Sequence, residues 1–210
     1  MIFDLWDTLV DWPLDDGIAH RRALLERLAI EEAEFDRRWR EGHRARETGP
    51  LGVAYAALGI PEEHLDEHVA HRHEVTRRAL RPRPGVPETL DELRRRDIRL
   101  GLISMCTEDV PAVWPETEFA GRFDAESFSA SCGLVKPEPE IYLDTAARMG
   151  VDPAACLYVG DGANDELRGA TDARMTPVLI VPRGREPFWP EVRSWDGLRI
   201  NDIREVVDLC

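Results

Sequence analysis

The pattern of hydrophobic and polar positions changes twice along the chain. Residues 2–6 are an apolar run with a β-compatible composition and predict a first strand. Apolar positions then recur at helical spacing through residues 14–80, which predicts an all-helical insert of about four helices. These helices are expected around residues 18–28, 31–46, 51–58 and 61–80, with Gly-Pro and Gly-Ile-Pro sequences at their boundaries.

Beyond a proline-rich linker at residues 82–87, short apolar runs alternate with helical segments. Strands are expected at residues 99–104, 126–130, 156–160 and 177–181, and helices at 87–96, 137–149, 165–175 and 200–210. Residues 182–196 are rich in Pro and Trp and fit neither pattern. Five strands with helical crossovers predict an α/β fold with a doubly wound parallel sheet. The expected organisation is an α/β core domain of residues 1–13 and 81–210, with a helical domain of residues 14–80 inserted.

Polar side chains occur where the predicted strands end. Asp4 is at the end of the first strand, Ser104 ends the second, Lys136 follows the third, and Asp161 with Asp165 and Glu166 follow the fourth. Ligands bind such sheets at the carboxyl ends of the strands, so these side chains are expected to meet there. Lys136 is the only lysine among 27 basic residues, which favours a specific need for its compact charge.

These segments resemble the four motifs of the haloacid dehalogenase-like (HAD) hydrolase superfamily, in order and over most of the chain. The similar segments are Phe3-Asp-Leu-Trp-Asp-Thr-Leu-Val10, Leu102-Ile-Ser104, Gly133-Leu-Val-Lys-Pro-Glu-Pro139 and Val159-Gly-Asp-Gly-Ala-Asn-Asp-Glu166. The resemblance implies a Rossmannoid core in which the helical insert is a cap of the family's first type.

The same resemblance implies the roles of individual residues. Asp4 would attack the substrate and form a covalent aspartyl intermediate, Ser104 would hydrogen-bond the transferring group, and Lys136 would neutralise charge beside Asp4. Thr8, Ser104 and Lys136 would contact the substrate. Acidic residues of the fourth motif would hold Mg²⁺.

Elementary chemistry agrees with these roles. A carboxylate and a phosphoryl group are both anionic, so a metal and a lysine must offset their repulsion before attack is feasible. Oxygen ligands favour Mg²⁺, and Asp4, the main-chain carbonyl of Trp6 and Asp161 could supply three of them. Either Asp165 or Glu166 is expected to bind the metal through water, and the other to interact with the helix dipole.

Trp6 departs from the pattern of the family's phosphatases, which usually have an aspartate there as general acid and base. Asp7 is one residue further on, but its side chain is expected to point elsewhere and to serve a turn. Three alternatives remain open: the leaving group is already good, the cap contributes an acid, or the reaction is not phosphate hydrolysis.

The composition indicates which classes of binding partner are not expected. The formal charge is −14, so nucleic acid and an anionic membrane surface are unexpected partners. The start of the chain shows no signal-peptide pattern, no apolar run is long enough to span a membrane, and the four cysteines form no C-x-x-C pair. A cytoplasmic protein is expected.

We therefore expect an enzyme, a Mg²⁺-dependent HAD-like phosphatase that acts on a small phosphorylated molecule through an aspartyl-phosphate intermediate. One alternative is a metal-independent dehalogenase-like hydrolase, which Trp6 favours and the acids at Asp161, Asp165 and Glu166 oppose. Another is a catalytically silent relative that binds a metal or ligand. The physiological substrate and the oligomeric state do not follow from the sequence.

Overall fold

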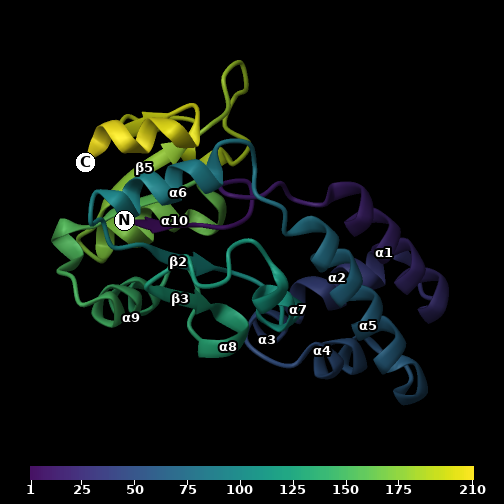
Figure 1. Cartoon of the computed structure of the whole chain (residues 1–210). Coiled ribbons are helices and arrows are strands. Elements are labelled where there is room, and N and C mark those ends of the chain that lie inside the picture. Colours follow the sequence, from purple (N-terminus) through teal and green to yellow (C-terminus); the bar gives the residue numbers. More distant parts are fainter.

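The computed structural model describes residues 1–210 and places a parallel sheet beside a group of helices (Figure 1). Six strands lie in the order β3-β2-β1-β4-β5-β6. They are β1 (Ile2–Phe3), β2 (Gly101–Ser104), β3 (Ala125–Phe128), β4 (Leu157–Gly160), β5 (Thr176–Ile180) and β6 (Leu198–Ile200). The predicted α/β fold with a doubly wound parallel sheet is confirmed. The strand order reverses between β1 and β4, so the loops that leave these two neighbours flank the switch point where ligands bind in such sheets.

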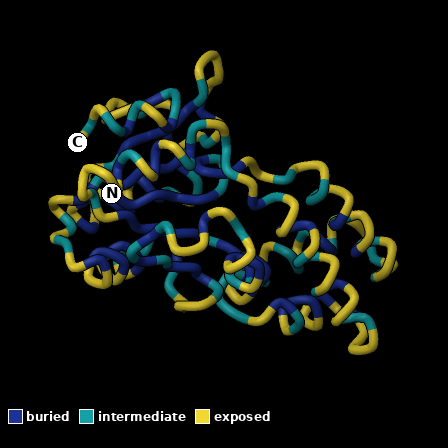
Figure 2. The backbone as a smooth tube through the Cα atoms, viewed as in Figure 1, coloured by how far each residue is buried: buried dark blue, intermediate teal, exposed yellow.

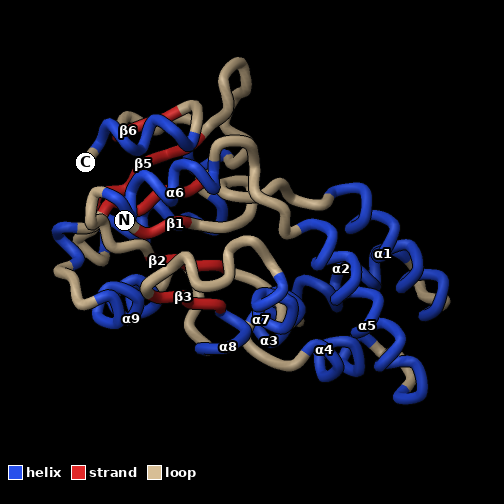
Figure 3. Tube along the Cα trace, in the orientation of Figure 1, coloured by secondary structure: helices blue, strands red, loops and turns tan.

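Helices cover both faces of the sheet (Figure 3). The covering helices are α6 (Val86–Arg95), α9 (Pro139–Met149), α10 (Glu166–Asp172) and the 3-10 helix η5 (Ile203–Leu209). Two short helices, α7 (Asp109–Val113) and α8 (Ser129–Cys132), lie past the ends of β2 and β3, beside the helical insert. Side chains alternate along each strand, so Phe3 packs in one layer of the core with Leu90 of α6, whereas Ile2 packs in the other with Ile141 of α9. Because both faces are covered, the central strands β1, β2 and β4 are almost entirely buried and appear mostly dark blue in Figure 2.

The insert between β1 and β2 consists of five helices on one side of the sheet (Figure 1). These are α1 (Leu14–Leu28), α2 (Glu32–Glu41), α3 (His43–Glu47), α4 (Leu51–Leu58) and α5 (Glu62–Ala79). They enclose a small apolar cluster of their own, which includes Leu24, Phe35 and Tyr55. Asp109 of α7 is fully buried and accepts hydrogen bonds from Arg72 and Thr76 of α5, so the insert is tied to the core.

Two expected elements differ from the structure in length. The helix expected at residues 31–46 is two helices, α2 and α3, because the chain leaves helical geometry at Gly42, a residue with low helix propensity. The first strand ends at Phe3 instead of Trp6, because the chain turns there: the carbonyl of Leu5 accepts hydrogen bonds from the backbone of Leu9 and Val10.

The end of the chain also differs from the prediction. The expected closing helix at residues 200–210 starts as a sixth strand, β6, and continues as the 3-10 helix η5. The carboxylate of Asp202 caps η5 by accepting a hydrogen bond from the backbone of Arg204. A three-residue strand at the sheet edge is too short to give a periodic pattern. No helix is long and apolar enough to cross a membrane.

Candidate active site

Asp4 lies at the switch point, one residue past β1. Its backbone N–H donates to the carbonyl oxygen of Val159 at 2.8 Å, which continues the contact between β1 and β4 and fixes the residue. The side chain is buried. Burial raises the pKa of Asp4 to about 7, although the ammonium group of Lys136 opposes this rise.

Lys136 lies between two buried carboxylates. Its Nζ donates to Oδ1 of Asp4 at 2.5 Å and to Oε2 of Glu166 at 2.6 Å. Burial by itself would lower the pKa of Lys136, but the charges of Asp4 and Glu166 outweigh it and raise the pKa above its ordinary value. The ammonium group therefore stays charged beside Asp4.

Glu166 is fully buried at the start of α10 and holds this lysine in place. Oε2 also accepts a hydrogen bond from the Tyr158 hydroxyl at 2.7 Å, and Oε1 accepts one from the backbone of Gly162 at 2.9 Å. The side chain crosses directly over Gly160, where a Cβ atom would come within 2.1 Å of Oε1. A glycine is required at position 160 for this arrangement.

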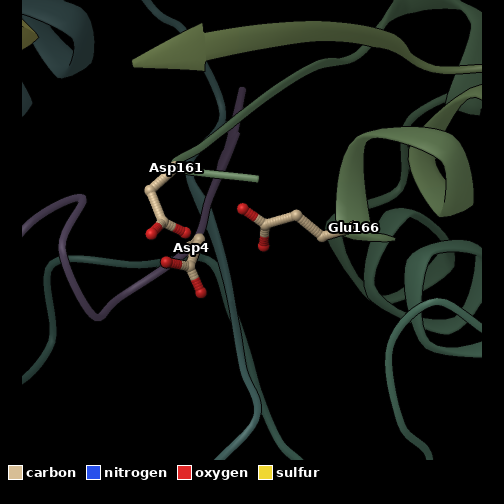
Figure 4. A group of neighbouring side chains, drawn as sticks. All are labelled: Asp4, Asp161 and Glu166. Carbon is tan, nitrogen blue, oxygen red and sulfur yellow. The ribbon is translucent and has the colours of Figure 1, made fainter. Parts of the chain in front are cut away.

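Asp161 follows β4 and faces Asp4 (Figure 4). Its Oδ1 accepts a hydrogen bond from the backbone of Ala163 at 3.0 Å, and its Oδ2 accepts one from Nε1 of Trp189 at 2.7 Å. Burial raises the pKa of Asp161 to about 6, and the negative charge of Asp4 adds to this rise.

The donor set fits a magnesium ion. Asp4, after β1, and Asp161 and Glu166, between β4 and the start of α10, bring carboxylate oxygens within 4.8 Å of one another (Figure 4). Three carboxylates face the single ammonium of Lys136, so the group has an excess of negative charge that a bound divalent cation would offset. Glu166 is engaged by three donors, which leaves Asp4 and Asp161 better placed to ligate such an ion.

Two buried hydroxyl groups near this cluster have no hydrogen-bond partner within the protein. They are Oγ of Ser104, at the end of β2, and Oγ1 of Thr8, in the loop after β1. Both residues are fully buried, and an unpaired buried hydroxyl is costly. A bound ligand with oxygen atoms would satisfy both groups.

The structure does not bring every predicted residue to the cluster. The side chain of Asp165 is 41% exposed and binds Arg168 at 2.5 Å, because its left-handed backbone directs it outward while Glu166 turns inward. Asp7 also has a left-handed backbone, and its Oδ1 accepts hydrogen bonds from the backbone of Trp12 and from Arg83. Asp7 is therefore a turn residue, as expected from the sequence.

A cavity of about 400 Å³ lies between the helical insert and the core. Trp6, Met105, Cys106 and Thr107 form its core side, next to the loops that carry Asp4 and Ser104. The insert supplies an aromatic wall and several polar groups. The lining residues of the insert include Phe35, Trp39, Tyr55, Arg46, Glu47 and Arg72, and Trp12, just before the insert, also lines the cavity. Trp6 and Trp12 pack edge to face, with ring centroids 5.1 Å apart.

Two contributors to the carboxylate cluster were missed by the sequence interpretation. Trp189 lies in the stretch of residues 182–196 that fits neither helix nor strand, and no periodic signal places its indole on Asp161. Tyr158 was part of a strand taken as apolar, yet its hydroxyl group binds Glu166. A tyrosine in an otherwise apolar strand is the one sequence signal that could have indicated a buried polar partner.

Residues 1–173 match the family model of the haloacid dehalogenase-like hydrolases, and the chain belongs to this family. The predicted family resemblance is confirmed. Over 104 residues the chain is 34% identical to a glyceraldehyde 3-phosphate phosphatase of Methanopyrus kandleri, a match that covers 48% of this chain and 44% of that protein. Over 127 residues it is 34% identical to a phosphoserine phosphatase of Thermus thermophilus, which covers 59% of this chain and 49% of the relative. The matches thus span about half the length of these relatives.

Solved structures show the same fold. A HAD phosphatase from Thermococcus onnurineus superposes with a TM-score of 0.72 at 21% identity, covering 99% of this chain and 95% of that one. A 2-haloacid dehalogenase from Pseudomonas syringae superposes with a TM-score of 0.69 at 22% identity, covering 99% of this chain and 96% of that one. Because both a phosphatase and a dehalogenase have this fold, the fold does not select the reaction.

Proposed function

We propose that the protein is a Mg²⁺-dependent phosphatase that hydrolyses small phosphate monoesters through an aspartyl-phosphate intermediate on Asp4. The observation that carries this proposal is the buried Asp4–Lys136 pair beside Asp161, which combines a nucleophile, a fixed cation and a metal ligand. The names of the relatives at 34% identity add support, since both are phosphatases of small phosphorylated molecules.

Each residue has a role in this reaction. An oxygen of Asp4 attacks phosphorus, Lys136 offsets the charge of the incoming phosphoryl group, and the unpaired hydroxyls of Ser104 and Thr8 donate to its oxygens. A magnesium ion held by Asp4, Asp161 and, as we predict, the main-chain carbonyl of Trp6 would neutralise charge on the phosphoryl oxygens. Glu166 keeps Lys136 in position.

The proposal includes the division into domains predicted from the sequence, with residues 1–13 and 81–210 as the core and residues 14–80 as a cap. The cavity between them then receives the leaving group, and its volume of about 400 Å³ suits a small molecule. The net charge of −14 argues against nucleic acid as substrate. A cytoplasmic location belongs to the same proposal.

A screen of phosphorylated metabolites and aryl phosphates, with and without Mg²⁺, tests the function. We expect Mg²⁺-dependent release of phosphate, and rapid quenching with a ³²P-labelled substrate should trap label on the wild type but not on Asp4→Asn. Absence of phosphate release from every compound would leave the catalytically silent relative as the better interpretation.

A metal-independent dehalogenase is the second candidate, and Trp6 is the observation that favours it. Halide leaves without a proton, so this reaction needs no acid at position 6. The buried carboxylates of Asp161 and Glu166 oppose it, because they add negative charge where a halide-releasing site has no need of a cation. Halide release from 2-haloacids in excess chelator would establish this candidate in place of the phosphatase.

A further inference from the structure

Glu47 is the only carboxylic acid among the residues that line the cavity. Its side chain is 14% exposed, and its closest cation is Arg46, at 3.6 Å. No donor makes a hydrogen bond to its carboxylate, whereas Arg46 is held by the carbonyl oxygen of Trp39 and stacks on that indole ring. An acid without a hydrogen-bond partner therefore faces the same space as Trp6.

Contacts with the core hold α3, the helix that ends at Glu47, beside the loops that follow Ser104 and Lys136. At the start of α3, Arg44 binds Glu138, two residues after Lys136, at 2.7 Å. Just beyond α3, the backbone of Leu51 donates to Glu108, four residues after Ser104, at 2.7 Å. The helix also packs against α8, beside α7 (Figure 1). It is thus anchored to the two loops that follow Ser104 and Lys136.

The surroundings of Glu47 favour the protonated form of its carboxyl group more than water does. Burial raises the pKa of Glu47, and the charge of Asp109 adds to this rise, while Arg46 and Arg72 oppose it. Glu47 lines the same cavity as Cys106, which follows β2. Burial, with the negative charge of Glu47, raises the pKa of the Cys106 thiol.

Other titratable groups at the cavity are less suited to donate a proton. His20 binds the hydroxyl of Tyr55, and burial lowers its pKa to about 3, so it is neutral at pH 7. Burial and the charge of Arg46 also lower the pKa of His43. Burial raises the pKa of Tyr55 well above neutral pH. Arg21 is held by acids of α2 and cannot release a proton.

We propose that Glu47 of the insert is the general acid and base of the hydrolysis, in place of the carboxylic acid that position 6 lacks. This assignment rests on the proposed phosphatase function. It also favours one of the three explanations for Trp6: the insert contributes the acid, so esters with poor leaving groups, such as alkyl phosphates, are substrates.

The proton and electron balance is complete without another reactant. In the first step an Asp4 oxygen bonds to phosphorus, the bond from phosphorus to the ester oxygen breaks, and that oxygen keeps the electron pair and takes the proton of Glu47. In the second step the Glu47 carboxylate takes a proton from water as the water oxygen bonds to phosphorus. The bond from phosphorus to Asp4 then breaks, which frees phosphate and restores both carboxyl groups.

The test compares an alkyl phosphate with p-nitrophenyl phosphate, whose leaving group needs no proton. Glu47→Gln should lower kcat/KM for the alkyl ester by about 10²–10⁴-fold and change that for p-nitrophenyl phosphate only a few-fold. Glu41→Gln, an exposed acid of the neighbouring helix α2, is the matched control and should change neither value. Equal losses with both esters would overturn the proposal in favour of a structural or substrate-binding role.

Two further measurements keep the proposal falsifiable. In the wild type, kcat/KM should depend weakly on the acidity of the leaving group, and a steep dependence would overturn the assignment even if Glu47→Gln failed to fold. Trp6→Asp added to Glu47→Gln should recover part of the alkyl activity, whereas no recovery in a folded, metal-binding double variant would count against it. A wild type inert toward p-nitrophenyl phosphate with Mg²⁺ would instead refute the proposed function itself.

Discussion

The carboxylate cluster at the carboxyl ends of β1 and β4 lies close to the cavity under the helical insert, but the two are built differently. In the cluster, Lys136 and Glu166 are buried and engaged by several partners each, so little freedom remains. The cavity wall is aromatic, and Trp12 in it is 46% exposed. The cluster is rigid and preorganised for one charge distribution, while the cavity offers contact area and a single acid, Glu47.

This difference suggests a division of work. Side chains at the strand ends act on the phosphoryl group, which is the same in every substrate. The insert acts on the leaving group, which differs from one substrate to another. Changes in the cluster should therefore alter kcat for all esters, and changes in the cavity should alter the dependence on the leaving group.

The strongest test of the cluster is Asp4→Asn compared with Asp7→Asn. Loss of the nucleophile should reduce kcat by roughly 10⁴-fold or more for every ester. Asn also tolerates the left-handed backbone of residue 7, so the Asp7 variant should stay within about threefold of wild type. Steady-state kinetics on one aryl ester measures kcat for both variants. Similar losses of kcat in the two would mean that Asp4 is not the nucleophile.

Lys136→Met tests whether the buried ammonium group is needed for charge balance. We expect kcat to fall by about 10²–10³-fold, because one fixed positive group at the phosphoryl site is lost. Leaving Asp4 and Glu166 unpaired should also cost about 3–5 kcal/mol of folding free energy. Urea denaturation and kinetics measure the two effects, and a stable, active variant would contradict the role of the lysine.

The sequence predicted the cluster better than the cavity for a physical reason. Ser104 ends a strand, and Asp4, Lys136 and Asp161 each come after one. The parallel arrangement brings the ends of neighbouring strands together. The positions of these residues relative to the predicted strands were therefore enough to predict that they meet. The choice between Asp165 and Glu166 depended on a left-handed turn that no spacing rule resolves.

Trp189 and Glu47 could not be placed from the sequence. Trp189 reaches Asp161 from a loop without periodic pattern, and Glu47 ends a five-residue helix whose separate existence depends on a break at Gly42. The position of either side chain depends on how distant segments pack. Pattern rules describe one segment at a time, so they cannot supply that information.

Asp161→Asn tests the charge of the cluster without substrate. The folded pKa of about 6 lies above the ordinary value of 3.8, so ionisation of Asp161 destabilises the metal-free protein as pH rises through this range. In excess chelator the variant should gain stability relative to wild type between pH 4.5 and pH 7.5, by about 2 kcal/mol. The histidines are common to both proteins and cancel in the difference. Mg²⁺ should raise the Tm of the wild type more than that of the variant, and a pH-independent difference would contradict the assigned pKa.

Trp12→Ala tests the cavity wall. The indole packs on Trp6 and lines the cavity, so its loss should raise KM for an aryl phosphate by about threefold to tenfold, in line with one aromatic contact. Inhibition by inorganic phosphate, which occupies only the cluster, should not change. If the variant bound both the ester and inorganic phosphate equally more weakly, the cavity would not act on the leaving group alone.

The smallest expected effect concerns the contact between the insert and the core. Arg44 and Glu138 form an exposed ion pair between α3 and the loop after Lys136, so salt should weaken it. Glu138→Gln removes the pair, and we expect KM to rise by about twofold or less in low salt with kcat nearly unchanged. The same variant should lose the salt dependence of KM that the wild type shows, because the interaction that salt screens is already gone. An equal response of KM to salt in both proteins would show that this ion pair does not contribute to substrate binding.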